Sequence, residues 1–208
     1  MSVRRRKRKS ANTGAEKWKN KLWFEVKTPT YIGDKSLGST PASDINHIVG
    51  RTLKVSLMDL TDSFHDLNYH LTFKMTTVTG NVAHSEFWQQ ELSRDYRRSQ
   101  IRNHRSQVEG IFNLTLQDKS KLRVTTFVVT PFRAAHSTKK EIRMAILKKL
   151  EEIAAESTFG HFVNKIVSYD LREELRPIAE EVFPIKILEI SKVKVIRYPE
   201  GSVLAGSS

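Results

Sequence analysis

Residues 121–153 read KLRVTTFVVT PFRAAHSTKK EIRMAILKKL EEI, and the spacing of apolar residues changes in the middle of this stretch. Before Pro131 apolar residues alternate with polar ones, which is the period of a half-buried β-strand. After Pro131 they recur every three or four residues, which is the period of an amphipathic helix. Thr138 and Glu141 have capping-box spacing, so the predicted helix begins at Thr138 and runs to about Glu156. The change of period predicts an α+β fold.

Further strands are predicted upstream by the same alternation. Val78 falls out of phase with the strand before it, which indicates a bulge near Thr76 and Thr77. Gly80 and Asn81 predict the turn of a hairpin, and residues 117–120 predict the turn of a second one. The predicted strands cover residues 53–57, 69–75, 112–116 and 122–128.

Two shorter helices and a last strand are predicted downstream. A helix after Thr158 buries four apolar residues, namely Phe159, Phe162, Val163 and Ile166. Another opens at Asp170, is bent or broken at Pro177 and ends by Pro184, because proline lacks the N–H that a helix interior needs.

We therefore expect one α+β domain over residues 23–197. A β-rich, barrel-like half packs against a C-terminal helical segment, and a final strand returns to the body. The predicted parts are a basic arm at 1–22, the β-rich half at 23–135, the helical segment at 136–184, the final strand at 185–197 and a mobile tail at 198–208.

The charge of the chain indicates a polyanion as its partner. The 208 residues include 35 Lys and Arg against 23 Asp and Glu, for a net charge of +12 and a pI near 9.9. Residues 150–183 depart from this balance with 3 basic and 8 acidic residues, so we expect that segment to face protein. The chain has no cysteine, which excludes disulfides, Cys-based zinc sites and a thiol nucleophile. No apolar run approaches the ~18 to 20 residues of a membrane span, and we expect a soluble, unexported protein.

Five arginines against one acid occupy residues 94–105, with amides, a histidine and a tyrosine between them. Arginine grips phosphate oxygens in pairs and stacks on bases, so the run favours RNA. The alternative is a solvated basic helix face. Residues 1–22 predict a second contact, an arm that orders on RNA, through Arg4, Arg5, Arg6, Lys7, Arg8, Lys9, Lys17, Lys19 and Lys21.

Two motifs suggest other chemistry and are weak. Residues 33–40 resemble a P-loop, but Ser39 stands where the phosphate-binding lysine is required. Asp59, Asp62, His65 and Asp66 could hold a divalent cation, although such residues more often cap turns through their own backbone. The sequence predicts no catalytic residue, no metal and no cofactor.

The order of motifs along the chain resembles the ribosomal S-three-A, or eS-one, family of archaea and eukaryotes. The segments that carry it are Lys17-Trp18-Lys19, Trp23-Phe24, Thr40-Pro41, Gly50-Arg51, Asp59-Leu60-Thr61, Arg94-Asp95-Tyr96-Arg97-Arg98-Ser99, Leu122-Arg123-Val124, and Arg133-Ala134 with Ser137, Lys139, Ile142 and Arg143. The resemblance covers residues 17–197. The chain lacks the long C-terminal extension of eukaryotic members, which favours an archaeal type.

The resemblance implies a non-catalytic, cytoplasmic constituent of the small ribosomal subunit. It implies binding to rRNA on the platform, near the rRNA 3′ end and the mRNA exit, and contact with neighbouring ribosomal proteins, mRNA and initiation factors. The phosphate-binding candidates it implies are Arg94, Arg97, Arg98, Arg102, Arg105, Arg133, Lys139, Lys140 and Arg143. Two alternatives use the same basic surface: a nucleic-acid-processing enzyme with a metal at Asp59, Asp62 or Asp66, and a free RNA-binding regulator.

Overall fold

The computed structural model of the chain describes Trp18 and residues 21–199. The strands are β1 (Leu22–Lys27), β2 (Ser36–Ala42), β3 (Thr52–Ser56), β4 (Tyr69–Thr79), β5 (Val82–Leu92), β6 (Gln107–Thr115), β7 (Lys121–Val129) and β8 (Ile187–Arg197). The helices are α2 (Met58–Thr61), α3 (Arg94–Gln100), α4 (His136–Glu156), α5 (Phe159–Val167) and α6 (Asp170–Val182), with short 3-10 helices η1 (Thr30–Ile32), η2 (Ile45–His47) and η3 (Phe64–Asn68). The predicted α+β class is confirmed.

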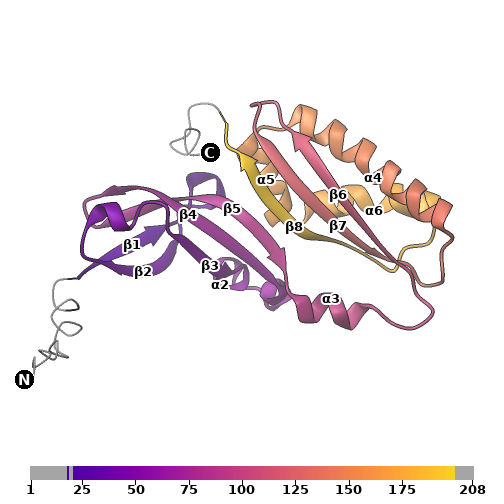
Figure 1. The fold of residues 1–208 in the computed structure, drawn as a ribbon, viewed down its shortest axis with the longest axis horizontal. Coiled ribbons are helices and arrows are strands. Elements are labelled where there is room, and N and C mark those ends of the chain that lie inside the picture. The colour runs from indigo at the N-terminus through magenta and orange to yellow at the C-terminus, as the bar shows by residue number, and fades with distance from the viewer. Residues whose placement is uncertain (1–17, 19–20, 200–208) are drawn as a thin grey trace, which may run out of the picture.

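All eight strands belong to one sheet with the order β2-β1-β5-β8-β7-β6, while β4 pairs with both β5 and β3. β5 is the shared element, because β4 runs along one edge of it and β1 and β8 take opposite ends of the other edge. In Figure 1 strands β1 to β5 fill the left part of the view, and β6 to β8 with the long helices fill the right.

The first predicted hairpin is confirmed in detail. β4 and β5 meet through Gly80 and Asn81, and Gly80 takes a φ of +60°, a conformation that glycine adopts at little cost. The register shifts between Met75 and Thr77, where the out-of-phase Val78 predicts a bulge. A further shift between Thr72 and Phe73 has no counterpart in the prediction.

The second predicted hairpin, β6–β7, is also confirmed, and β8 returns antiparallel beside β7. Alternate residues of β6 are buried, and these side chains face the helices. The opposite face of this part of the sheet is left open, as the exposed alternate residues of β6 show.

The long helix begins earlier than predicted. α4 starts at His136 with Ala135 as its N-cap, and no side chain caps it, so the capping box of Thr138 and Glu141 is wrong. The helix is fixed by its apolar stripe instead, because Ile142, Ile146 and Leu150 are buried. These three are at most 1% exposed and pack in the main core.

The remaining helices follow the predicted order. α5 buries the four apolar residues predicted for it. α6 contains Pro177 and continues to Val182, so a break at Pro177 is wrong, while the predicted bend there stays a prediction. Tyr198, which the prediction assigned to the tail, is 8% exposed and donates a hydrogen bond from its hydroxyl to the Phe87 carbonyl at 3.0 Å. Residues 1–17, 19–20 and 200–208, which hold most of the predicted arm and tail, lie outside the described residues.

The core of the fold predicts a large difference between two positions of α4. Ile146→Ala removes a side chain that is 1% exposed and should lower the free energy of unfolding by about 2–5 kcal/mol, because it leaves a cavity. Met144→Ala, at a position 47% exposed, should change it by less than about 0.5 kcal/mol. Urea denaturation measures both. Equal losses for the two variants would contradict this assignment of the buried face.

Candidate nucleic-acid interface

The arginine run forms the short helix α3 and the loop that follows it. Arg94, Arg98 and Arg102 are exposed, and Arg105 is partly buried. α3 follows the end of β5, and a loop of residues 101–106 joins it to the start of β6 (Figure 1). The run therefore lies between two strands of the sheet rather than at a terminus.

Arg97 differs from its neighbours because it faces the sheet. Its Nη1 lies 3.4 Å from the Ser191 hydroxyl on β8 and 3.6 Å from Oε1 of Glu109 on β6. A guanidinium held in this way joins α3 to the sheet and has fewer donors free for phosphate.

The two basic segments predicted separately, 94–105 and 133–143, meet at the open end of the β6–β7 hairpin. The Thr130 backbone N–H donates to the Ser106 carbonyl at 3.0 Å, and the Ser106 N–H donates to the Thr130 hydroxyl at 3.1 Å. The Ala134 N–H donates to the Ser106 hydroxyl at 3.1 Å. Ser106 and Thr130 are buried, so these bonds are shielded from water. We call these hydrogen bonds between residues 106, 130 and 134 the clamp. Along the chain it is flanked by Arg102, Arg105 and Arg133.

The second basic segment, residues 133–143, is exposed at Arg133 and becomes more buried along α4. Arg133 and Lys140 are exposed, whereas Lys139 and Arg143 are partly buried. The Nε of Arg143 is buried and has no hydrogen-bond partner in the described part of the chain. The exposed members are the better placed for a phosphate.

The predicted arm is only partly visible. Arg4 to Lys9, Lys17 and Lys19 lie outside the described residues. The Nζ of Lys21 lies 4.0 Å from the ring centroid of Trp18, a cation–π contact. Lys21 precedes β1, which lies in the left part of Figure 1, while α3 lies to the right, so the fold does not bring Lys21 and the arginine run together.

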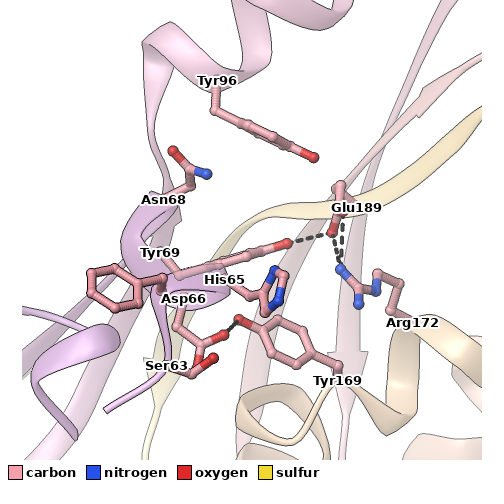
Figure 2. A pocket seen from close by; sticks show the side chains of 10 residues that line it. Ser63, His65, Asp66, Asn68, Tyr69, Tyr96, Tyr169, Arg172 and Glu189 are labelled. Carbon is pink, nitrogen blue, oxygen red and sulfur yellow. Dashed lines mark hydrogen bonds and ion pairs between the residues drawn. The ribbon is translucent and has the colours of Figure 1, made fainter. Parts of the chain in front are cut away.

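A pocket of about 570 Å³ lies where η3, β4, α3, α6 and β8 meet, and Figure 2 shows its lining. On one wall of the pocket lies Glu189 of β8. The Tyr69 hydroxyl donates to its Oε2, and Nη1 of Arg172 lies 3.0 Å from both carboxylate oxygens. Burial, and then the charge of Glu189, raise the pKa of Tyr69 well above its ordinary value, which keeps the hydroxyl protonated as a donor.

Asp66 on the opposite wall is held in a similar way. It is 4% exposed and accepts hydrogen bonds from the hydroxyls of Thr61 and Tyr169. Burial, followed by the bond to Asp66, raises the pKa of Tyr169. Each carboxylate therefore accepts a hydrogen bond from a tyrosine far away in the sequence, Tyr69 for Glu189 and Tyr169 for Asp66.

The acidic cluster suggested as a cation site is organised as a turn. Asp62 ends α2 in the left-handed conformation, with a φ of +57°, and Asp66 is bound as described above. Within residues 21–199 no group of three or more His, Asp or Glu is arranged to hold a metal ion. The P-loop-like segment forms the turn after η1 and most of strand β2, and only the three-residue 3-10 helix η2 lies between β2 and β3. None of the described helices is long and apolar enough to cross a membrane.

Sequence reasoning missed two groups of residues. The network of Tyr69, Tyr169, Arg172 and Glu189 joins positions up to 120 residues apart, which no local pattern reveals. Exposed cations on β7 and β8 were also missed, although their alternation with buried residues carries a signal. Lys121 and Arg123 on β7 alternate with Leu122 and Val124, and Lys194 alternates similarly on β8.

The Glu189 network predicts a measurable loss on removal of one hydroxyl. Tyr69→Phe should lower the free energy of unfolding by about 1.5–3 kcal/mol, because a buried carboxylate loses a donor. Tyr96→Phe is the matched control, since its hydroxyl has no hydrogen-bond partner among the residues described. Denaturant titration measures both variants, and an unchanged midpoint for Tyr69→Phe would show that the bond adds nothing.

Comparison with known proteins gives a consistent result. The model of the ribosomal S3Ae family matches residues 9–199. A relative from Saccharolobus solfataricus, called small ribosomal subunit protein eS1, is 39% identical over 193 residues, covering 92% of this chain and 93% of the relative. A protein of the same name from Desulfurococcus amylolyticus is 36% identical over 184 residues, covering 88% and 86%.

Proposed function

Because this chain belongs to the ribosomal S3Ae family, we propose that it binds small-subunit rRNA through the arginine surface, formed by Arg94, Arg98, Arg102, Arg105 and Arg133. It is a structural constituent of the small ribosomal subunit, of the archaeal type, and not an enzyme. It acts in the cytoplasm as part of that subunit, with rRNA and ribosomal proteins as its partners.

The clamp between Ser106 and Thr130 is the observation that carries the proposal. It brings two basic segments, separate in sequence, to one edge of the fold. Arginine offers five N–H donors in a fixed fork, and a phosphate offers paired acceptors, so each exposed guanidinium can hold one phosphate. Lys139, Lys140 and Arg143 extend the surface along α4, with Lys140 the most exposed of these.

The remaining predicted contacts are proposed on the family resemblance. The platform, near the rRNA 3′ end and the mRNA exit, is the proposed location of the surface. Contact with mRNA and initiation factors follows from that location. Binding by the arm, with Arg4 to Lys9, Lys17, Lys19 and Lys21, would add a separate contact.

Replacing three exposed arginines tests the arginine surface. Arg94→Ala, Arg98→Ala and Arg102→Ala together should weaken binding to an rRNA fragment at least about 100-fold, because each charge-assisted contact contributes about 1.5–3 kcal/mol. Fluorescence anisotropy measures affinity, and circular dichroism verifies the fold. The control replaces Lys27, Arg51 and Lys74 by alanine, which removes equal charge from β1, from the residue before β3 and from β4.

Salt dependence provides the second readout of the same experiment. The slope of log K against log salt should become less steep by roughly 2–3 in the triple variant, at about 0.7 to 0.9 per lost phosphate contact. Unchanged affinity and slope in the triple variant would place the rRNA contact elsewhere.

Arg97→Ala should lower the stability of the protein more than its affinity for rRNA, since Arg97 contacts Ser191 and Glu109.

The acidic part of α6 is proposed as a contact for basic ribosomal proteins, because its carboxylates repel phosphate. Glu174 and Glu180 are paired within the molecule, with Lys165 at 2.9 Å and Arg176 at 2.7 Å. Glu173 and Glu181 are exposed and have no ion pair in the described part of the chain. They are therefore the carboxylates left for a partner.

Reversing these two charges tests that contact. Glu173→Lys with Glu181→Lys should weaken retention of the protein on small subunits, because a basic neighbour is then repelled, and should leave or raise its affinity for naked rRNA. Sedimentation of labelled protein with subunits measures retention, with Glu25→Lys as the control. Normal retention would show that these carboxylates are merely solvated.

A further inference from the structure

The face of strands β6, β7 and β8 that points away from α4 to α6 is exposed in its half farther from α3. The buried residues of β7, such as Leu122 and Val124, face α4 to α6, and the intervening residues point the other way. On β6 the intervening residues are exposed without exception from Gln107 to Thr115. This face is open over the half of the hairpin farther from α3.

The strand register arranges four cations on the open face. Asn113 of β6 pairs with Arg123 of β7, which pairs with Lys194 of β8. In the adjacent row Thr115 pairs with Lys121, which pairs with Arg197. Neighbouring strands lie about 4.8 Å apart, so the charges are close together. We call Lys121, Arg123, Lys194 and Arg197 the basic sheet face.

Among the residues that the structure describes, no carboxylate neutralises these cations. All four are exposed, and none has a carboxylate at ion-pair distance in the described part of the chain. Arg123 contacts the Asn113 amide at 3.0 Å, and Lys194 lies 5.4 Å from the ring centroid of Trp88. The basic sheet face therefore carries an uncompensated positive charge.

The acids near it are already engaged. Asp118, in the turn before Lys121, accepts a hydrogen bond from the Phe159 N–H at 2.9 Å. Glu91 of β5 is 2.6 Å from the Lys192 ammonium, and Glu109 is 3.6 Å from Arg97. Like charges gathered without counter-ions are unfavourable in the free protein, and an anionic partner relieves this repulsion.

The basic sheet face lies on the same side of β6 as α3, because Glu109, which Arg97 contacts, shares the exposed face of β6 with Asn113. A hollow of about 200 Å³ lies between α3 and β8, lined by Glu91, Leu92, Arg94, Arg97, Ser191 and Lys192. From Glu109, beside Arg97, to Thr115 the strand extends about 20 Å at roughly 3.3 Å per residue. A nucleic-acid backbone that leaves α3 can follow this track.

We propose that the basic sheet face binds the sugar-phosphate backbone of small-subunit rRNA, as a second contact beside the arginine surface. The inference rests on the proposed function. The strand register fixes the positions of the cations on this face, with Asn113 and Thr115 as hydrogen-bonding neighbours, and the Lys194 ammonium lies 5.4 Å from the Trp88 ring. The face therefore holds phosphate by charge and does not read bases by stacking.

The test replaces Lys121, Arg123, Lys194 and Arg197 by glutamine and compares the variant with the wild type and with the triple arginine variant. Affinity for the rRNA fragment should fall at least tenfold, and the salt slope should fall by about 3. Hydroxyl-radical footprinting should show nucleotides that lose protection in the glutamine variant and keep it in the arginine variant.

Two single variants distinguish the loss of a phosphate contact from the loss of folding. Lys194→Gln removes a free charge, whereas Lys192→Gln, two residues away on the same face, removes one that is paired with Glu91. The first should reduce the salt slope by about 0.7 to 0.9 and the second by clearly less. Equal slopes in both would overturn the inference.

The outcomes separate this inference from the proposed function. If the glutamine variant binds rRNA as the wild type does and the arginine variant does not, the basic sheet face is not an rRNA contact and the proposed function stands. If only the glutamine variant loses binding, the inference stands and the arginine surface is wrong. If the glutamine variant binds naked rRNA normally but fails to enter subunits, the face contacts an acidic protein and the inference is overturned. A wild-type protein without affinity for small-subunit rRNA would overturn both.

Discussion

The insertion of β8 between β7 and β5 is the interaction on which the rest of the structure depends. Nine register pairs join it to β7, and three join it to β5 through Gln89, Gln90 and Glu91. Without the β5 pairs the strands on the two sides would form separate sheets. Because β8 lies far from β5 in the sequence, this part of the sheet depends on closing a long loop. The entropy of closing such a long loop is offset by burial of apolar residues such as Val193 and Val195.

The Glu189 network reinforces the same junction with polar groups. A carboxylate buried on β8 would be costly alone, and Tyr69 from β4 and Arg172 from α6 satisfy it. The network specifies which strand and which helix meet β8. This explains a polar, tyrosine-rich pocket in a protein without catalytic function (Figure 2).

The arrangement of charge follows from the sheet. The open end of the β6–β7 hairpin brings Arg102 and Arg133 to one edge, and β8 aligns Lys194 with Arg123. The acids of α6 lie on the helical layer, away from the open face of the sheet. A structural constituent of a ribonucleoprotein needs several phosphate contacts held at fixed spacing, and a sheet with rigid connections provides that spacing.

The sequence by itself determined the local elements, because strand and helix periods and turn residues act over a few positions. Gly80 and Asn81 specify the first hairpin and Val78 its bulge, and the motif order specifies the family. Local rules failed at the start of α4, where burial of Ile142 and Ile146 outweighs a capping box. The tertiary structure alone decided that Arg97 faces Glu109, that the two basic segments share an edge, and that four cations line the open face of the sheet. Those contacts depend on strand pairing across long stretches of chain, which a local pattern cannot encode.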